Sequence, residues 1–360
     1  MTGSTITRID CHLHRSAFTT ATGAHGTGGN LRLREIETLL VRVETAEGLH
    51  GWGEGFGFSL CATTRDAVER LIAPACLGAE SRDIAGLMRQ LQRRFHNYGR
   101  NGPVTFGLSA IDIALWDIAA RRAGKPLHAL LGDAARPRVA AYASLLRYGV
   151  AEDVARATAE AIRRGYAQIK LHEIDRACIA AARAAAPPEV PLMLDINCAF
   201  DDVAAARGFC GAVAGMNIRW VEEPTWPPED FAAMAALRGE GRVALAAGEN
   251  LSAAADFARL IAAGAVDVVQ PSITKHGGVS AMLEVAALAR AAGVAMVPHA
   301  PYFGPGLLAT LHLLAATPEA EPLEIYFADL ATAPFGAALQ PVDGFIAVPS
   351  APGLGLEPLL

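Results

Sequence analysis

The chain has 360 residues, of which 52% are hydrophobic and 19% are charged, and its formal net charge is −6. This composition is typical of a globular protein with a large core, and the acidic balance without a dense run of Lys and Arg argues against a nucleic-acid partner. Apolar runs are short and the first residues are polar, so neither a membrane span nor a signal peptide is predicted. Six cysteines without a C-x-x-C pair indicate reduced thiols in a cytoplasmic protein.

The first third of the chain predicts strands followed by helices. Residues 36–44 and 49–55 have strand patterns, and the second ends in the glycine-rich GWGEGFG. Residues 16–30, rich in Thr, Gly and Ala, are expected to form a mobile loop. Helical patterns then cover residues 63–73, 83–96 and 104–122. Residues 124–138 break the pattern and mark a domain boundary.

Beyond this boundary, short apolar runs alternate with Ala-rich amphipathic helices such as 151–164 and 278–292. The runs cover residues 139–144, 168–172, 192–197, 218–224, 244–250, 266–272, 294–299 and 322–326. Strands that alternate with helices in this way predict a closed parallel (β/α) barrel. An open doubly wound sheet is the alternative, but no G-x-G-x-x-G opens a helix here.

Polar residues stand near the carboxyl end of most of these runs. From one to the next the distance along the chain is 23 to 27 residues, about one βα unit. They are Lys170, Asp195, Glu222, Glu249, Ser272, His299 and Glu324. Because the carboxyl ends of barrel strands meet at one mouth, where barrel active sites lie, these side chains are expected to share a cavity.

Asp195, Glu222 and Glu249 follow consecutive strands. Three ionised carboxylates cannot lie close together without a compensating cation, and oxygen-only ligation favours Mg²⁺. The alternative is that these acids form salt bridges or cap the helices that follow. The spacing favours the magnesium site.

Basic residues are predicted on both sides of this metal site. Lys170 and His172 alternate in QIKLH and therefore face the same side of their strand, and His299 ends another strand. A Lys or His beside a metal-bound carboxylate suits removal of an α-proton, since the metal neutralises the enediolate that results. Lys275 could lower a neighbouring pKa or lie on the surface, and Glu324 could be an acid or a structural carboxylate.

Together these motifs resemble the enolase superfamily, and in particular its mandelate racemase and muconate-lactonizing branch. The matching segments are Lys170-x-His172, Asp195-Ile-Asn197, Val221-Glu222-Glu223-Pro224, Gly248-Glu249-Asn250, Lys275-His276-Gly277-Gly278 and His299. The resemblance implies a modified (β/α)8 TIM-type barrel, (β/α)7β, over residues 135–328. It also implies an N-terminal α+β capping domain over residues 1–128, on which a tail, residues 329–360, packs.

The resemblance also implies roles for single residues. Asp195, Glu222 and Glu249 would be the Mg²⁺ ligands. Glu223 would contact these ligands and not the metal itself, and Asn197 would lie near metal or substrate. Residues 16–30 and 52–58 would be specificity loops over the mouth. The substrate would be a small carboxylate, and the protein would be a homo-oligomer, a dimer or an octamer.

Two positions depart from the family pattern. His172 replaces the second Lys of K-x-K, and Ser272 stands where racemases carry an Asp paired to the strand-seven His and cycloisomerases carry a Lys. Dehydration of a hydroxy acid or sugar acid, or racemisation or epimerisation, is therefore the leading hypothesis, because dehydration tolerates an incomplete dyad. The alternatives are a cycloisomerase of a carboxylated lactone and a barrel that only binds a metal and a ligand.

Two further motifs are not assigned to the site. His12-Leu13-His14 contains the H-x-H pattern of some metal sites, but it precedes the barrel, and alternating strand residues explain it. Gly304–Pro305–Gly306 opens a helix and could bind an anion, although loop geometry alone requires such glycines.

Overall fold

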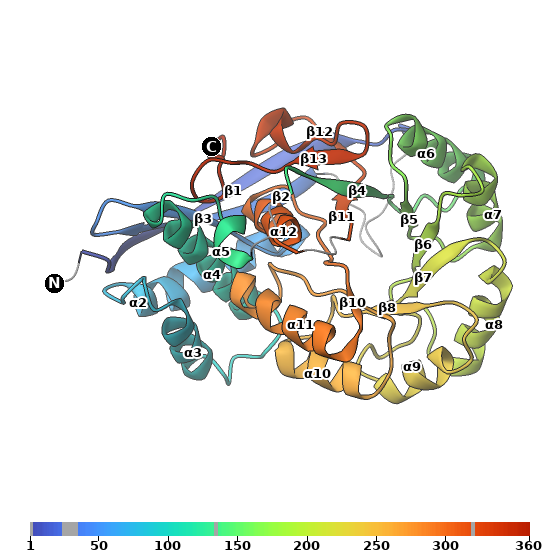
Figure 1. Ribbon diagram of the computed structural model, residues 1–360, viewed down its shortest axis with the longest axis horizontal. Helices are drawn as coiled ribbons and strands as arrows, with labels where there is room; N and C mark the ends of the chain where they lie inside the picture. Colours follow the sequence, from blue (N-terminus) through green and yellow to red (C-terminus); the bar gives the residue numbers. More distant parts are fainter. Residues whose placement is uncertain (1–2, 24–34, 133–135, 318–320) are drawn as a thin grey trace.

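The computed structural model describes residues 3–23, 35–132, 136–317 and 321–360. An antiparallel sheet with helices forms one end of the molecule, and a ring of strands with helices outside it forms the other (Figure 1). The antiparallel sheet has the order β12–β1–β2–β3. Its strands are Ile6–Thr19 (β1), Glu35–Thr45 (β2), His50–Gly55 (β3) and Asp329–Leu330 (β12).

Helices cover one face of this sheet. They are the 3-10 turn Phe58–Leu60 (η1), Cys61–Ala67 (α1), the π-helical turn Val68–Ile72 (η2), Ala73–Cys76 (α2), Ile84–Arg94 (α3), Pro103–Arg122 (α4) and His128–Leu131 (α5). The three predicted helical segments are thus present. The first is interrupted by η2 and α2, where Pro74 removes a backbone donor.

Parallel strands form the ring in the order β10–β9–β8–β7–β6–β5–β4–β11. The strands are Arg138–Ser144 (β4), Ile169–Leu171 (β5), Leu192–Asp195 (β6), Ile218–Glu222 (β7), Leu245–Ala247 (β8), Val268–Val269 (β9), Ala295–Met296 (β10) and Leu323–Tyr326 (β11). The helices between them are Ala151–Arg163 (α6), Arg176–Ala185 (α7), Val203–Val213 (α8), Phe231–Arg238 (α9), Ala254–Ala262 (α10), Gly278–Ala292 (α11) and Pro305–Ala315 (α12). This is the predicted (β/α)7β barrel, with its strands shorter than the apolar runs.

Hydrophobic periodicity explains why the helices lie outside the ring. In α6, Val154, Ala157, Thr158 and Ala161 are buried, the spacing of one helical face. Inside the ring, Tyr142, Met193, Trp220, Ala246, Val268 and Val297 form a separate apolar cluster beneath the strand ends. This layer is the floor of the mouth.

The cap sheet and its longest helix approach each other closely because of two glycines. A Cβ atom on Gly53 would lie 1.8 Å from the carbonyl oxygen of Ala110, and one on Gly51 would lie 2.2 Å from that of Ala114. Both alanines belong to α4, which also contacts α11 of the barrel. Among the described helices, α4 alone is long and apolar enough to cross a membrane, but 72% of that stretch is buried, which identifies it as a core helix.

Helix α12 and the cap are joined by a carboxylate. Oε2 of Glu54, on β3, accepts hydrogen bonds from the backbone N–H groups of Gly304, at 3.2 Å, and Gly306, at 2.8 Å. The glycine segment therefore does bind an anion, but that anion belongs to the chain itself. Burial raises the pKa of Glu54 to about 7, against the opposing effect of these N–H groups.

The last residues contact both parts of the chain. Residues Phe345–Ala347 (β13) pair antiparallel with β4, after a 3-10 turn at Gly336–Leu339 (η3). Glu357 accepts a hydrogen bond from Trp52 Nε1 at 2.7 Å and pairs with Arg121 at 2.7 Å, both in the N-terminal part. Figure 1 shows the C-terminus beside the cap sheet.

Four predictions, on two loops, on His12 and His14 and on the cysteines, can be compared with the structure. Residues 16–19, expected in a loop, belong to β1, and residues 24–30 lie outside the described residues. In the second predicted loop, Trp52 to Gly55 form part of β3, so only residues 56–58 lie beyond the strand. His12 and His14 lie on β1, as the strand interpretation predicted, and all six cysteines are unpaired.

Candidate metal centre and active site

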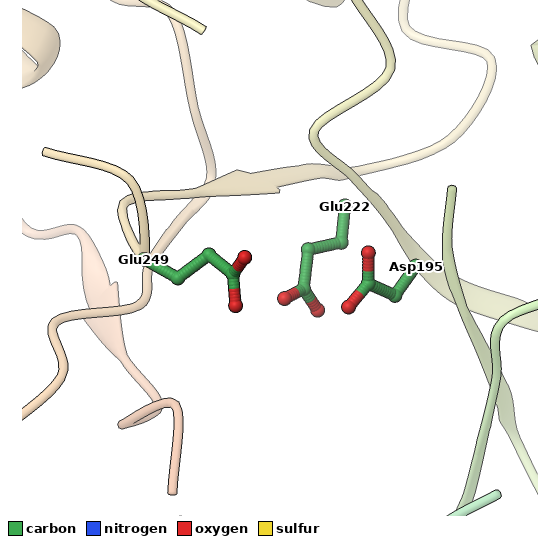
Figure 2. Close-up of side chains that lie close together, drawn as sticks. All are labelled: Asp195, Glu222 and Glu249. Atoms are coloured by element: carbon green, nitrogen blue, oxygen red, sulfur yellow. The ribbon is translucent and has the colours of Figure 1, made fainter. Parts of the chain in front are cut away.

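Three carboxylates meet at the mouth of the barrel (Figure 2). Asp195 ends β6, Glu222 ends β7, and Glu249 lies two residues beyond β8. One oxygen from each lies within 4.8 Å of the others. The parallel ladder pairs Asp195 directly with Glu222, which explains why two of the groups are neighbours.

Helix capping does not explain these three acids. The helices that follow them are α8, α9 and α10. Asp202 and Asp230 cap α8 and α9, and Asp256 accepts the backbone N–H groups of Ser252 and Ala253 at the start of α10. Other acidic residues therefore satisfy the starts of these helices, and capping does not account for the three carboxylates at the strand ends.

Salt bridging explains part of the arrangement, because Lys170 lies among the acids. Its Nζ atom is 3.2 Å from Asp195, 3.3 Å from Glu222 and 2.8 Å from Glu324. Burial lowers the pKa of Lys170, but the carboxylates of Glu222, Glu324 and Asp195 outweigh it and leave the pKa well above its usual range. A single lysine nevertheless cannot balance this many buried acids.

The pKa values of the three acids diverge as a consequence. Burial and the charge of Asp195 raise the pKa of Glu222 well above its ordinary value. For Asp195, burial is outweighed by Lys170 and His172, and its pKa falls. Burial is also outweighed at Glu249, mainly by His299 and Lys275. Like charges this close ionise together only beside a cation.

The donor set fits Mg²⁺. All three ligand groups are hard carboxylate oxygens, and two of the three residues are buried. Carboxylates with room for water and substrate are the usual surroundings of Mg²⁺ in proteins. Asp195, Glu222 and Glu249 are therefore a candidate metal site.

His172 lies next to one member of this carboxylate group. Its Nε2 atom is 3.2 Å from Oδ2 of Asp195, and its Nδ1 atom is hydrogen-bonded to the carbonyl oxygen of Leu145. Because a carbonyl only accepts, Nδ1 carries a proton and Nε2 faces the mouth. The guanidinium of Arg147 donates to the carbonyl oxygen of His172 and to Oδ1 of Asn197, at 3.3 Å for the latter.

His299 lies next to a different member. Its Nε2 atom is 2.5 Å from Oε2 of Glu249, and its Nδ1 atom is 3.3 Å from Oγ of Ser272. The sequence predicts an incomplete dyad at Ser272 and His299. The Ser272 hydroxyl nevertheless lies at hydrogen-bond distance from the ring, although it carries no charge.

Glu324 and Lys275, the other two candidate residues, lie in different parts of the site. Glu324 accepts a hydrogen bond from the backbone N–H of Ala300 at 2.8 Å with Oε2, while Oε1 pairs with Lys170. It thus joins β11 to the segment after β10, where the described residues show no strand pairing. Lys275 is buried, 3.4 Å from Oδ1 of Asn250 and over the ring of Phe56, so it is not a surface lysine.

Glu223 and Asn197 lie in the loops just beyond the strands, both with positive φ. Glu223 accepts a hydrogen bond from Asn250 Nδ2 at 2.6 Å, and burial together with Glu249 and Asp195 raises its pKa to about 8. The backbone N–H of Asn197 donates to Asp195 at 3.1 Å. Both residues therefore contact the neighbours of the candidate ligands or the ligands themselves.

Sequence analysis missed several residues of the site. Gln270 Nε2 and Trp220 Nε1 both donate to Oε2 of Glu222, at 2.8 and 3.3 Å. Each lies two residues from a residue already singled out, Ser272 or Glu222, and alternation along a strand could have found them. Tyr302 contacts Ser272 and His299 from a loop, where no periodicity indicates it.

Two family models together match most of this chain. Residues 32–132 match the family model "Mandelate racemase / muconate lactonizing enzyme, N-terminal domain", and residues 153–359 match "Enolase C-terminal domain-like". The D-galactarolactone cycloisomerase of Agrobacterium fabrum is 34% identical over an alignment of 347 residues, which covers 91% of this chain and 90% of that protein.

Solved structures agree with this match. L-talarate dehydratase from Polaromonas sp. JS666, complexed with Mg and L-glucarate, superposes with a TM-score of 0.81 at 30% identity, covering 99% of this chain and 95% of that one. A racemase from Streptomyces coelicolor A3(2) with bound magnesium gives 0.83 at 28% identity, covering 98% and 96%.

Proposed function

Because the chain belongs to the mandelate racemase/muconate lactonizing enzyme family of the enolase superfamily, we propose that it is an Mg²⁺-dependent enzyme that removes the α-proton of a small carboxylate. The substrate is a hydroxy acid or sugar acid. The reaction is dehydration, or racemisation or epimerisation, at the α-carbon.

One observation carries this proposal: two imidazole rings contact different members of one carboxylate group. His172 lies beside Asp195 and His299 beside Glu249. A substrate carboxylate at the metal site would therefore have a ring nitrogen on either side of its α-carbon. Asp195, Glu222 and Glu249 would hold the metal ion, which supplies positive charge against the charge left on the carboxylate when the α-proton departs.

The positions of the two histidines support a role for both in proton transfer. Lys170 directs its ammonium group to Asp195, Glu222 and Glu324, so it serves as a fixed positive charge and not as the base. One histidine accepts the α-proton through Nε2. In dehydration the C–H bond breaks, a C=C bond forms, and the β-hydroxyl leaves as water with a proton from an acid in the site. In racemisation the second histidine returns a proton to the other face.

Polar groups on the first barrel strand favour a polyhydroxy substrate. Ser144 is paired in the ladder with Lys170, and residues paired in this way share a face of the sheet, so its side chain points into the barrel. Its buried hydroxyl has no hydrogen-bond partner among the described residues. A hydroxyl or carboxyl group of a sugar acid would satisfy it. Two of the three similar proteins named above are likewise a sugar-lactone and a sugar-acid enzyme.

A second candidate function is cycloisomerisation of a carboxylated lactone. The similarity to D-galactarolactone cycloisomerase over nine-tenths of both chains favours it. This reaction begins with the same proton removal, but the leaving group is the ring oxygen, which stays attached to the product. Position 272 holds a serine and not a lysine, which does not argue against cycloisomerisation if His299 is the base.

Exchange with solvent deuterium tests both candidates. The protein with Mg²⁺ in D₂O is incubated with aldonates, aldarates, their lactones and simple hydroxy acids, and products are followed by NMR and mass spectrometry. Dehydration loses the mass of one water, cycloisomerisation conserves the mass, and racemisation incorporates deuterium at the α-carbon without other change. Bound Mg²⁺ with no α-exchange or product from any acid would contradict the proposal and favour a binding protein.

The oligomeric state can be measured on the same purified protein. We expect a homo-oligomer, a dimer or an octamer, and a cytoplasmic protein, and light scattering after size exclusion measures the first of these. A mass equal to one chain at micromolar concentration would contradict it.

A further inference from the structure

A cavity of about 730 Å³ lies between the cap and the barrel. Helix α3, the segment that follows it and the start of α4 form its cap side, and residues 252–253 and 276–277 form its barrel side. None of the described residues that line it is a candidate metal ligand. Its volume is in the range of about 300–1,000 Å³ that is usual for small-molecule sites, so it can hold a ligand of its own.

Helix α3 presents a basic face to this cavity. Arg89 and Arg93 line it one helical turn apart, whereas Leu87 and Leu91, on the other face of the helix, are buried in the cap core. Arg100, in the segment after the helix, is the third arginine of the lining. No acidic residue is found among the described residues that line the cavity, although the net charge of the chain is −6. The cavity is therefore a positively charged site in an acidic protein.

These three arginines have no partner within the protein. Most other described arginines form ion pairs, as Arg121 does with Asp117. Within the described part of the chain, the guanidinium groups of Arg89, Arg93 and Arg100 form no ion pair and no hydrogen bond, and all three side chains are exposed. A cleft lined by charges of one sign raises the local concentration of ions of the opposite sign. An anion would thus gain these contacts without breaking existing ones.

Acidic side chains next to the two walls do not cancel this charge. Asp256 accepts two backbone N–H groups at the start of α10 and pairs with Arg259. Asp83 accepts the backbone N–H of Gly86 at the start of α3. Both carboxylates are therefore engaged within their own helices.

The barrel side of the cavity contributes a buried nitrogen without a partner. His276 is 3% exposed, and its Nδ1 atom accepts the backbone N–H of Ser272 at 2.8 Å. Burial and the charge of Lys275 lower the pKa of His276 to about 3, so the ring is neutral and its proton is on Nε2. The carbonyl oxygen of Leu251 lies near the ring, but Nε2 has no hydrogen-bond partner among the described residues. An oxygen atom of a ligand at this wall would supply the acceptor.

We propose that this cavity is a second binding site, for a small molecule with two or more carboxylate or phosphate groups, which Arg89, Arg93 and Arg100 hold. A planar guanidinium can donate two parallel hydrogen bonds to a carboxylate or to a phosphate, so the three arginines suit several such groups on one ligand. Neither the site nor its ligand depends on the reaction proposed above, because no candidate metal ligand lines the cavity.

Titration calorimetry on the Mg²⁺-loaded full chain at constant ionic strength measures the binding. The probes are tricarballylate, which has three carboxylates, fructose 1,6-bisphosphate, which has two phosphates, and acetate as the reference with one charge. We expect tricarballylate or the bisphosphate to bind at least about 10-fold more tightly than acetate, and the tighter of the two identifies the anionic group. No binding of either probe at 10 mM, about 10-fold above a millimolar Kd, would overturn the proposal.

A pair of double variants locates the binding in the cavity. Arg89→Gln/Arg93→Gln should weaken the binding of the tighter probe by about 10-fold or more, since two charged donors are lost. Arg176→Gln/Arg290→Gln is the matched control, because Arg176 and Arg290 are also exposed and unpaired among the described residues but do not line the cavity. The control should bind as the wild type does. Equal affinities of the two double variants would overturn the proposal, since the probe would then bind elsewhere.

A variant that keeps all three arginines covers the case in which the first double variant does not fold. Gln90 also lines the cavity from α3, and Gln90→Glu places a carboxylate among the arginines, which should weaken the binding of the same probe by about 10-fold or more. Undiminished binding in folded Gln90→Glu would contradict the site.

Light scattering tests whether a second copy of this chain fills the cavity instead. We expect Arg89→Gln/Arg93→Gln to have the same mass in solution as the wild type. A smaller assembly would show that the arginines hold a neighbouring chain, and would overturn the small-molecule site. Because none of these measurements needs turnover, failure of the anion site leaves the proposed function untouched, and absence of α-exchange leaves the anion site untouched.

Discussion

Lys170 and Glu324 form an ion pair inside the barrel, with Nζ 2.8 Å from Oε1 and each side chain only 1% exposed. Removing one partner of such a pair leaves the other charge buried without compensation, which is strongly unfavourable. The pair also lies beside Asp195 and Glu222, so its loss changes the charge balance of the whole mouth.

We expect Lys170→Met to lower the free energy of unfolding of the metal-free protein by about 3–5 kcal/mol. Mg²⁺ should restore part of this loss, because a cation again faces the acids. Urea unfolding with and without Mg²⁺ measures both effects. The double variant Lys170→Met/Glu324→Gln should lose less unfolding free energy than the two single variants lose together. Strict additivity of the two losses would contradict the pairing.

The candidate metal ligands can be tested without a substrate. Glu249→Gln keeps the shape of the side chain but removes a charged oxygen donor, so Mg²⁺ affinity measured by titration calorimetry should fall by more than about 100-fold. Circular dichroism should show an unchanged fold. Asp112→Asn is the control, because Asp112 is also a buried carboxylate but contacts Ser280 at the junction of α4 and α11. Equal Mg²⁺ affinity of both variants would contradict the ligand assignment.

The raised pKa of Asp112 predicts that the stability of the protein depends on pH. Burial raises its pKa from 3.8 to about 7, against the hydrogen bonds from Ser280. Between these values the folded protein retains a proton that the unfolded chain has lost, so this contribution to stability falls as the pH rises from about 4 to 7 and is constant above. Its total is on the order of 4 kcal/mol.

The Asp112→Asn variant isolates this contribution. The difference in unfolding free energy between the variant and the wild type should shift in favour of the variant across that pH range. Urea unfolding at a series of pH values measures it. Glu54, whose pKa is also raised to about 7, contributes in the same range and should be replaced by Gln in both backgrounds. A difference that does not vary with pH would show that Asp112 is ionised in the folded protein.

Replacement of glycine by alanine should have opposite effects on stability at Gly53 and at Gly208. In Gly53→Ala the new Cβ would meet the carbonyl oxygen of Ala110 at 1.8 Å, so β3 and α4 must separate, at a cost of about 1–3 kcal/mol or more. In Gly208→Ala, on the exposed face of α8, the Cβ meets nothing within 4 Å, and stability should rise by about 0.5–1 kcal/mol. Thermal unfolding distinguishes the two, and equal effects would contradict the close packing of the cap.

The division of the chain into a cap of residues 1–128 with a tail of residues 329–360, and a barrel of residues 135–328, also has a test. Glu357→Ala removes the bonds to Trp52 and Arg121, and we expect a loss of about 1 kcal/mol because the carboxylate is half exposed. Hydrogen exchange should accelerate in β3 and the end of α4. Exchange that changes only in the barrel would contradict docking of the tail on the cap.

The sequence by itself determined the barrel and the place of its acids. Strands bury every second side chain and barrel strands are parallel, so apolar runs one βα unit apart necessarily bring Asp195, Glu222 and Glu249 to one mouth. The same reasoning located Lys170, His172 and His299. These results depend only on local periodicity and on the direction of the strands, both of which can be read from the order of residues.

Only the tertiary structure decided which of these groups touch. Lys170, a candidate base from the sequence, contacts three carboxylates, which lie on β6, β7 and β11. The sequence predicts an incomplete dyad at Ser272 and His299, but the Ser272 hydroxyl lies 3.3 Å from Nδ1 of the ring, and Tyr302, from a loop with no periodic pattern, contacts that hydroxyl. The backbone N–H of Gly304, at the start of α12, donates to Glu54, 250 residues away in the chain. Hydrogen bonds and ion pairs depend on distances of a few tenths of an ångström between segments remote in the chain, and no local pattern encodes them.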